Sequence, residues 1–245
     1  MAWTSARIPE PRGFLARLGR YEFVLLGSLC AIAAILLLFG LVTEEALEGD
    51  ASAFDRDILL ALRNPADLAD PIGPAWLERA ASDITALGGV PVLALVTLVA
   101  AGFLLIIRRQ AIALLVLLSA AGGTAVSFGL KLFFARVRPD LVPHQVDVFT
   151  SSFPSSHAMM SAMIYLTLGA LLARVQKQRR IKAYIMMVSV LLAVLIGASR
   201  VYLGVHWPTD VLAGWMVGSA WAMLCGTAAW WLHRRGHDAD GQAPD

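Results

Sequence analysis

The chain has 245 residues, of which 58% are apolar and 16% are charged, whereas about a quarter of the residues in a typical soluble domain are charged. The apolar residues gather in runs long enough to cross a bilayer, which takes about 20 residues, so an ordinary soluble domain is excluded. A net charge of +2, with no basic stripe interleaved with aromatic residues, also excludes a nucleic-acid partner.

Six apolar runs predict an all-α fold, an integral-membrane bundle of six transmembrane helices within residues 21–232. The expected spans are, in chain order, residues 21–42, 90–107, 111–134, 157–173, 183–201 and 210–232. A basic segment, 1–20, precedes the first span, which is too long for the apolar part of a signal peptide and is expected to be retained. The polar tail at 233–245 is expected to be disordered.

Basic residues predict the orientation, because they favour the cytoplasmic side of a membrane. They occur before the first span, between the second and third, between the fourth and fifth, and after the last. Six crossings place these segments on one side, so both termini are expected in the cytoplasm. The segments 43–89, 135–156 and 202–209 are then expected to face the periplasm or the outside.

The first outer segment contains one amphipathic stretch. Residues 54–63 place Ile58, Leu59 and Leu62 on one helical face. Two interpretations remain open, namely a helix lying in the membrane interface and a helix packed on the membrane domain.

Three cations from separate parts of the chain, Lys131, Arg138 and Arg200, are expected at outer span ends. A lone cation there snorkels to the headgroups, but several that converge on one face indicate a functional site. They would repel one another unless a polyanion neutralised them. Because the guanidinium of arginine binds phosphate oxygens in a bidentate way, they predict a phosphate site.

The start of the fourth span adds to this site. Ser155 and Ser156 occupy N-cap positions, and the N-terminus of a helix attracts anions. His157 follows in the first turn, where its imidazolium is expected to donate a proton to a leaving oxygen.

His206 and Asp210 are four residues apart, and Pro208 suits the first turn of a helix, so the carboxylate is expected beside the imidazole ring. It would hold one nitrogen as N–H and leave the other free to attack phosphorus. We predict that His157 protonates the leaving oxygen and then activates water against the phosphohistidine. No cofactor is expected. A zinc ion shared by these two histidines and Asp210 is disfavoured by the surrounding cations.

The three segments resemble the signature of the type 2 phosphatidic acid phosphatase (PAP2) superfamily, K-x6-RP, PSGH and SR-x5-H-x3-D. The first and third parts match at every fixed position, at 131–139 and 199–210, while in the second Ser156 stands where the family usually has glycine. The resemblance implies a metal-independent lipid phosphatase in the inner membrane of a bacterium. It also implies that Ser199 belongs to the phosphate site with Lys131, Arg138, Ser155, Ser156 and Arg200.

The lack of a large soluble domain favours a substrate whose tail stays in the bilayer. We expect a phosphomonoester or diphosphate headgroup, carried by an isoprenoid such as undecaprenyl diphosphate, by phosphatidylglycerol phosphate or by phosphatidic acid. Lipid A is the enzymatic alternative. A non-catalytic protein that binds or transports phospholipids is the alternative from another class. The partners expected are the bilayer and its phosphorylated lipids, and the sequence does not indicate an oligomeric state.

Two further polar residues of the outer segments have less certain roles. Arg136 either adds to the positive field around the phosphate or pairs with Asp140 or a lipid headgroup, and pairing is favoured slightly. His144 is expected to be solvated, as a lone histidine in a loop usually is.

Overall fold

The computed structural model describes residues 20–47, 53–142 and 150–240 of the chain. Within these residues the fold is helical, as predicted, apart from one short antiparallel hairpin. The elements in chain order are α2 (Arg20–Leu47), α3 (Ala53–Ala61), β1 (Arg63–Asn64), β2 (Asp67–Pro71), α4 (Ala75–Ala86), α5 (Val90–Ile106), α6 (Gln110–Phe134), α7 (Ser156–Val175), α8 (Arg179–Tyr202) and α9 (Pro208–Asp240).

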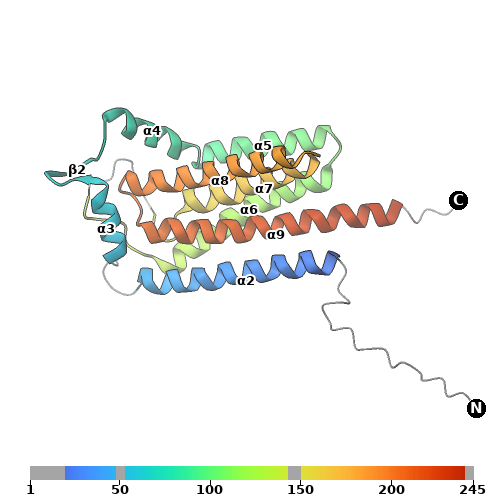
Figure 1. The fold of residues 1–245 in the computed structure, drawn as a ribbon, viewed down its shortest axis with the longest axis horizontal. Coiled ribbons are helices and arrows are strands. Elements are labelled where there is room, and N and C mark those ends of the chain that lie inside the picture. Colours follow the sequence, from blue (N-terminus) through green and yellow to red (C-terminus); the bar gives the residue numbers. More distant parts are fainter. Residues whose placement is uncertain (1–19, 48–52, 143–149, 241–245) are drawn as a thin grey trace, which may run out of the picture.

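The predicted all-α membrane bundle is confirmed, with five or six helical crossings by length and composition. The helices α2, α6, α7, α8 and α9 are each long and apolar enough to cross a membrane, and α4 with α5, a pair bent by 48°, pass the same test only when taken together. The long helices run side by side, and α2 begins at the same end of the bundle at which α9 ends (Figure 1).

The predicted spans differ from the observed helices mainly at their ends. α2 continues past residue 42 to Leu47, and α9 continues past residue 232 to Asp240. Residues 233–240 are therefore helical, and the prediction that they are disordered is wrong. The reason is that extending an existing helix is far easier than starting one. Residues 241–245, and residues 1–19 of the predicted basic segment 1–20, lie outside the described part of the chain.

The central helix of the bundle is α7, which packs against α6, α8 and α9. Two of its methionines, Met159 and Met163, are fully buried in the core. Glycines of α9 allow the close contact with α7, since a Cβ atom at Gly214 would lie 2.7 Å from the backbone oxygen of Ser155, and one at Gly218 would lie 2.5 Å from that of Met159. Small residues serve this purpose in membrane bundles, where lipid gives helices no hydrophobic reason to associate.

The helix α3, the hairpin and α4 lie at one end of the bundle (Figure 1). Leu59 of α3 is fully buried in a cluster with Trp207 and Val211, and Asp55 of the same helix is buried as well. Of the two interpretations of residues 54–63, the structure therefore supports packing on the membrane domain. The hairpin and α4, which packs on α8, were not predicted.

Candidate active site

The sequence segments that predict the site meet at the end of the bundle covered by α3 and α4. Lys131 lies in the last turn of α6, His157 in the first turn of α7, Arg200 in the last turn of α8 and Asp210 in the first turn of α9. Consecutive helices run in opposite directions, so the end of one lies beside the start of the next. Residues far apart in sequence are brought together in this way.

A cavity of about 700 Å³ lies at this end and extends between α5, α6 and α7. Six of the predicted site residues line it, namely Lys131, Arg138, Ser156, His157, Arg200 and His206. Farther along the helices its wall is apolar, formed by side chains such as Leu98 of α5, Phe128 of α6 and Ile164 of α7. The cavity therefore joins a charged chamber to an apolar slot.

Three predicted site residues do not line this cavity. Asp210 is fully buried against the ring of His206. Ser199 donates its hydroxyl proton to the backbone oxygen of Ile196 at 2.7 Å, inside its own helix. Ser155 is the N-cap residue of α7, as predicted, but its side chain makes no capping bond, and its buried hydroxyl has no partner among the described residues. The structure thus places the hydroxyls of Ser155 and Ser199 away from the cavity lining.

The start of α7 contributes two side chains to the cavity. The hydroxyl of Ser156 forms a hydrogen bond with that of Ser127 on α6, with 2.9 Å between the oxygens. The ring of His157 packs against the break between α4 and α5, where a Cβ atom at Gly88 would lie 3.3 Å from its Cδ2 atom. His157 is thereby placed on the cavity wall next to the bend.

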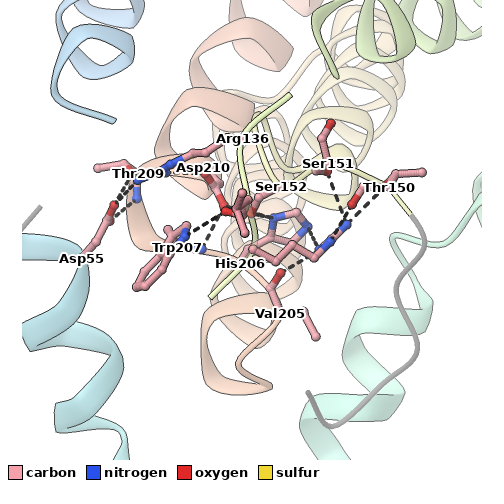
Figure 2. A network of polar contacts seen from close by, with 12 residues as sticks. Asp55, Arg136, Thr150, Ser151, Ser152, Val205, His206, Trp207, Thr209 and Asp210 are labelled. Carbon is pink, nitrogen blue, oxygen red and sulfur yellow. Dashed lines mark hydrogen bonds and ion pairs between the residues drawn. The ribbon is translucent and has the colours of Figure 1, made fainter. Parts of the chain in front are cut away.

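The imidazole of His206 is held at both nitrogens (Figure 2). Its Nδ1 atom lies 3.3 Å from the Oδ2 atom of Asp210 and 3.3 Å from the hydroxyl of Ser152. Because a carboxylate only accepts hydrogen bonds, Nδ1 carries the proton and Nε2 keeps its lone pair. Nε2 lies 3.2 Å from Nη1 of Arg138. The predicted pairing of His206 with Asp210 is confirmed.

The protonation state of His206 suits a nucleophile. Burial lowers the pKa of His206 to about 3, although the hydrogen bond and charge of Asp210 act to raise it. The ring is therefore neutral near pH 7, with a lone pair available for attack. Burial also lowers the pKa of Arg138, against the attraction of Asp210, but an arginine remains charged in proteins.

Two of the three cations are fixed by backbone oxygens. The Nζ atom of Lys131 donates to the oxygen of Ser151 at 2.5 Å. Arg138 donates from Nε to the oxygen of Thr150 at 2.8 Å and from Nη1 to that of Val205 at 2.6 Å. These bonds orient the side chains without neutralising their charge.

The third cation, Arg200, donates from Nη1 to the hydroxyl of Thr85 on α4 at 3.2 Å. Its buried Nε atom has no hydrogen-bond partner among the described residues. Within that part of the chain, none of Lys131, Arg138 and Arg200 forms an ion pair with a carboxylate. A cavity lined by three such cations strongly favours an anion with several oxygens.

Arg136 forms contacts that sequence reasoning missed. Its Nη2 atom lies 2.9 Å from Oδ2 of Asp55 and its Nη1 atom 2.5 Å from Oδ1 of Asp210, so the prediction that it pairs with Asp140 or a headgroup is wrong. Nothing local in the sequence relates Arg136 to partners 81 and 74 residues away. The one local hint of this pairing was Asp55, a charged residue within the amphipathic stretch that forms α3.

Ser152 is a second residue that the sequence did not indicate. It is fully buried, and its hydroxyl donates to the Oδ2 atom of Asp210, so it helps to fix the carboxylate beside His206. His144 lies outside the described residues. Within them, no group of three or more histidine, cysteine, aspartate or glutamate side chains is arranged to hold a metal ion.

Sequence comparison relates the chain to membrane phosphatases. Residues 112–234 match the PAP2 superfamily. The chain is 36% identical over 145 residues to phosphatidylglycerophosphatase B of Bacillus subtilis, and the aligned region covers 58% of this chain and 70% of the relative. It is 38% identical over 68 residues to an undecaprenyl-diphosphatase of Sulfolobus acidocaldarius, and this shorter aligned region covers 28% of this chain and 29% of the relative.

Two crystal structures resemble the fold. The PAP2-type phosphatidylglycerolphosphate phosphatase of Bacillus subtilis superposes with a TM-score of 0.71 at 28% identity, over 82% of this chain and 96% of the other. LpxE of Aquifex aeolicus superposes with a TM-score of 0.55 at 26% identity, over 76% of this chain and 99% of the other.

Proposed function

Because the chain belongs to the PAP2 superfamily and is a membrane lipid phosphatase, we propose that it removes phosphate from a lipid headgroup through a phosphohistidine on His206. The observation that carries this mechanism is the cavity that His206 lines together with Lys131, Arg138 and Arg200, none of which forms an ion pair with a carboxylate in the described part of the chain. Nε2 of His206 lies 3.2 Å from Arg138, and Asp210 lies behind the ring. A phosphate group there would meet positive charge and a nucleophile together.

In the first step, the lone pair of Nε2 attacks phosphorus in line with the bond to the leaving oxygen. The P–N bond forms as the P–O bond breaks, and His157 gives its proton to the departing oxygen. That oxygen leaves on the lipid alcohol from a monoester, or on the lipid monophosphate from a diphosphate. Lys131, Arg138 and Arg200 stabilise the charge that shifts among the remaining phosphate oxygens.

In the second step, water attacks phosphorus from the side that the leaving group has vacated. His157, now neutral, takes a proton from this water. The P–N bond breaks, its electron pair returns to Nε2, and inorganic phosphate leaves. Asp210 keeps the proton of Nδ1 in place through both steps, which is the orienting role of the acid in hydrolase triads.

The apolar slot between α5, α6 and α7 supports a substrate whose hydrocarbon tail remains in the protein or the bilayer while its headgroup reaches His206. We propose phosphatidylglycerol phosphate as the first substrate to test, because the relative named for it is matched over 70% of its length. Undecaprenyl diphosphate is one alternative, since a similar protein carries that name, and a lipid A phosphate is the alternative that the family resemblance implies. Phosphatidic acid shares the same headgroup chemistry.

The experiment is phosphate release by the purified protein in detergent, with excess chelator and a panel of these four lipids. His206→Ala and Asp210→Asn are measured beside the wild type. We expect phosphate release by the wild type to persist in chelator. Release should fall by at least about 10³-fold in His206→Ala, because the nucleophile is gone. With ³²P-labelled substrate, a labelled protein adduct should be trapped during turnover on the wild type but not on His206→Ala.

Different results would separate the alternatives. Release abolished by chelator would contradict the metal-independent mechanism. Binding of these lipids without release by the folded wild type would favour the non-catalytic binding or transport protein. Full activity of His206→Ala would show that another group attacks phosphorus.

A further inference from the structure

The carboxylate of Asp210 is connected, on the side away from His206, to a second buried carboxylate through one arginine (Figure 2). Arg136 bridges Oδ2 of Asp55 and Oδ1 of Asp210, at 2.9 Å and 2.5 Å. The arginine side chain is 8% exposed and both carboxylates are fully buried. None of the residues that line the cavity belongs to this bridge.

Asp55 also caps the helix that carries Asp210. Its Oδ1 atom accepts the backbone N–H of Thr209 at 2.8 Å, and its Oδ2 atom accepts the hydroxyl of Thr209 at 2.6 Å. That hydroxyl in turn accepts Nη1 of Arg136 at 2.9 Å. The first N–H groups of a helix lack partners within it, and here α3, from another part of the chain, supplies the capping carboxylate to α9.

The two oxygens of Asp210 have separate sets of donors. Oδ2 accepts the backbone N–H of Trp207 at 2.9 Å and faces Ser152 and His206, whereas Oδ1 accepts Arg136. Removing Arg136 would leave Oδ1 buried without a charged donor and would leave two carboxylates with no cation between them. Burying a negative charge without a charged partner is costly. The carboxylate of Asp210 would therefore rotate away or take up a proton.

We propose that Asp55 and Arg136 are positioning residues for the reaction, which act through Asp210 on the orientation and charge of His206. This inference rests on the proposed function of His206. Arg136 shares its positive charge between two carboxylates, so it does not fully neutralise Asp210. The imidazole ring of His206 becomes positive when Nε2 bonds to phosphorus, and the remaining negative charge of Asp210 stabilises it. The packing of α3 against the bundle thereby affects the reaction in the cavity.

The test compares kcat and KM of five variants on whichever lipid the wild type hydrolyses. Arg136→Gln removes the bridging charge, Arg136→Lys keeps the charge without the fork, and Asp55→Asn keeps the shape without the charge. Arg56→Gln and Asp57→Asn are matched controls, since both side chains lie exposed on α3, the helix that carries Asp55. Thermal unfolding in detergent establishes that each variant is folded.

We expect kcat to fall about 100-fold in Arg136→Gln, and about 10-fold in Arg136→Lys and in Asp55→Asn, because small misplacements of reacting groups cost this much. KM should stay within about 3-fold, since no bridge residue lines the cavity, and the controls should match the wild type. If Arg136→Gln does not fold, Arg136→Lys and Asp55→Asn decide the matter.

Two results would overturn the inference. One is a wild-type kcat in folded Asp55→Asn and Arg136→Lys. The other is a loss confined to KM, which would make these residues substrate contacts. A wild type that releases phosphate from no lipid would instead overturn the proposed function, so the two failures can be told apart.

Discussion

Ser156 and Ser127 share a single hydrogen bond that connects the start of α7 to α6 beside the charged chamber of the cavity. Removing one hydroxyl leaves the other without its partner, which costs about 1 kcal/mol. We therefore expect Ser156→Ala and Ser127→Ala to lower the thermal midpoint in detergent by similar amounts. The double variant should be no less stable than either, because both changes remove one interaction.

Ser156→Gly adds a test of the departure from the resembled signature. It should retain activity, since glycine is the usual residue there, while losing stability as Ser156→Ala does. Fully additive losses in the double variant would contradict a shared bond. A large loss of activity in Ser156→Gly would show that the serine hydroxyl contacts the substrate.

Single residues could be predicted from the sequence only where their relation is local or independent of partners. His206 and Asp210 are only four residues apart, so a contact between them was expected, although His206 lies in the loop just before α9. Arg136 illustrates the opposite case, because its charge is visible in the sequence but its partner Asp55 lies on α3, 81 residues away. Only the packing of α3 against α9 brings the two together.

At the scale of helices, the contact between α7 and α9 depends on Gly214, one turn after Asp210. A Cβ atom there would lie 2.7 Å from the oxygen of Ser155 and 3.0 Å from the Cβ atom of Ala158. Gly214→Ala should push the two helices apart, lower stability by about 1–3 kcal/mol and reduce kcat, because His157 and Asp210 lie on the separated turns.

The matched control is Gly226→Ala on the same helix, where an added Cβ atom would meet no atom within 4 Å. This variant should be as stable as the wild type or slightly more so, since alanine favours helix over glycine. Thermal unfolding and phosphate release measure both effects. Equal behaviour of the two variants would contradict the importance of the α7–α9 contact.

The helices themselves were largely predictable, because a membrane crossing has to be long and apolar. The parts that escaped prediction are those whose structure depends on neighbours. Residues 233–240 continue α9 without an apolar run. The hairpin of β1 and β2 is short, and α4 resembles a surface helix in sequence although it packs on α8 and contacts Arg200 through Thr85.

For the whole molecule, we propose that the chain lies in the inner membrane of a bacterium, with the phosphate site facing outward and both termini in the cytoplasm. This is supported by the basic residues in the α7–α8 connection and at the start of α8, at the end of the bundle opposite the site. The prediction is that Asp67→Cys, on the hairpin, reacts with an impermeant maleimide in intact cells, whereas Lys177→Cys reacts only after permeabilisation.

The measurement requires a background in which both native cysteines, Cys30 and Cys225, are replaced by serine. Asp67 and Lys177 are exposed in the structure, so the membrane alone should decide their reactivity. Labelling of Lys177→Cys in intact cells, with Asp67→Cys protected, would reverse the orientation.

The apolar slot between α5, α6 and α7 bears on how the protein encounters its substrate. A lipid whose tail occupies that slot arrives within the two-dimensional plane of the bilayer, so its bulk concentration is not the relevant variable. Reaction velocity should follow the mole fraction of substrate among surrounding amphiphiles, falling under surface dilution even when the total amount of substrate is unchanged. Fluidity and lateral crowding of the membrane then act as kinetic parameters of the enzyme.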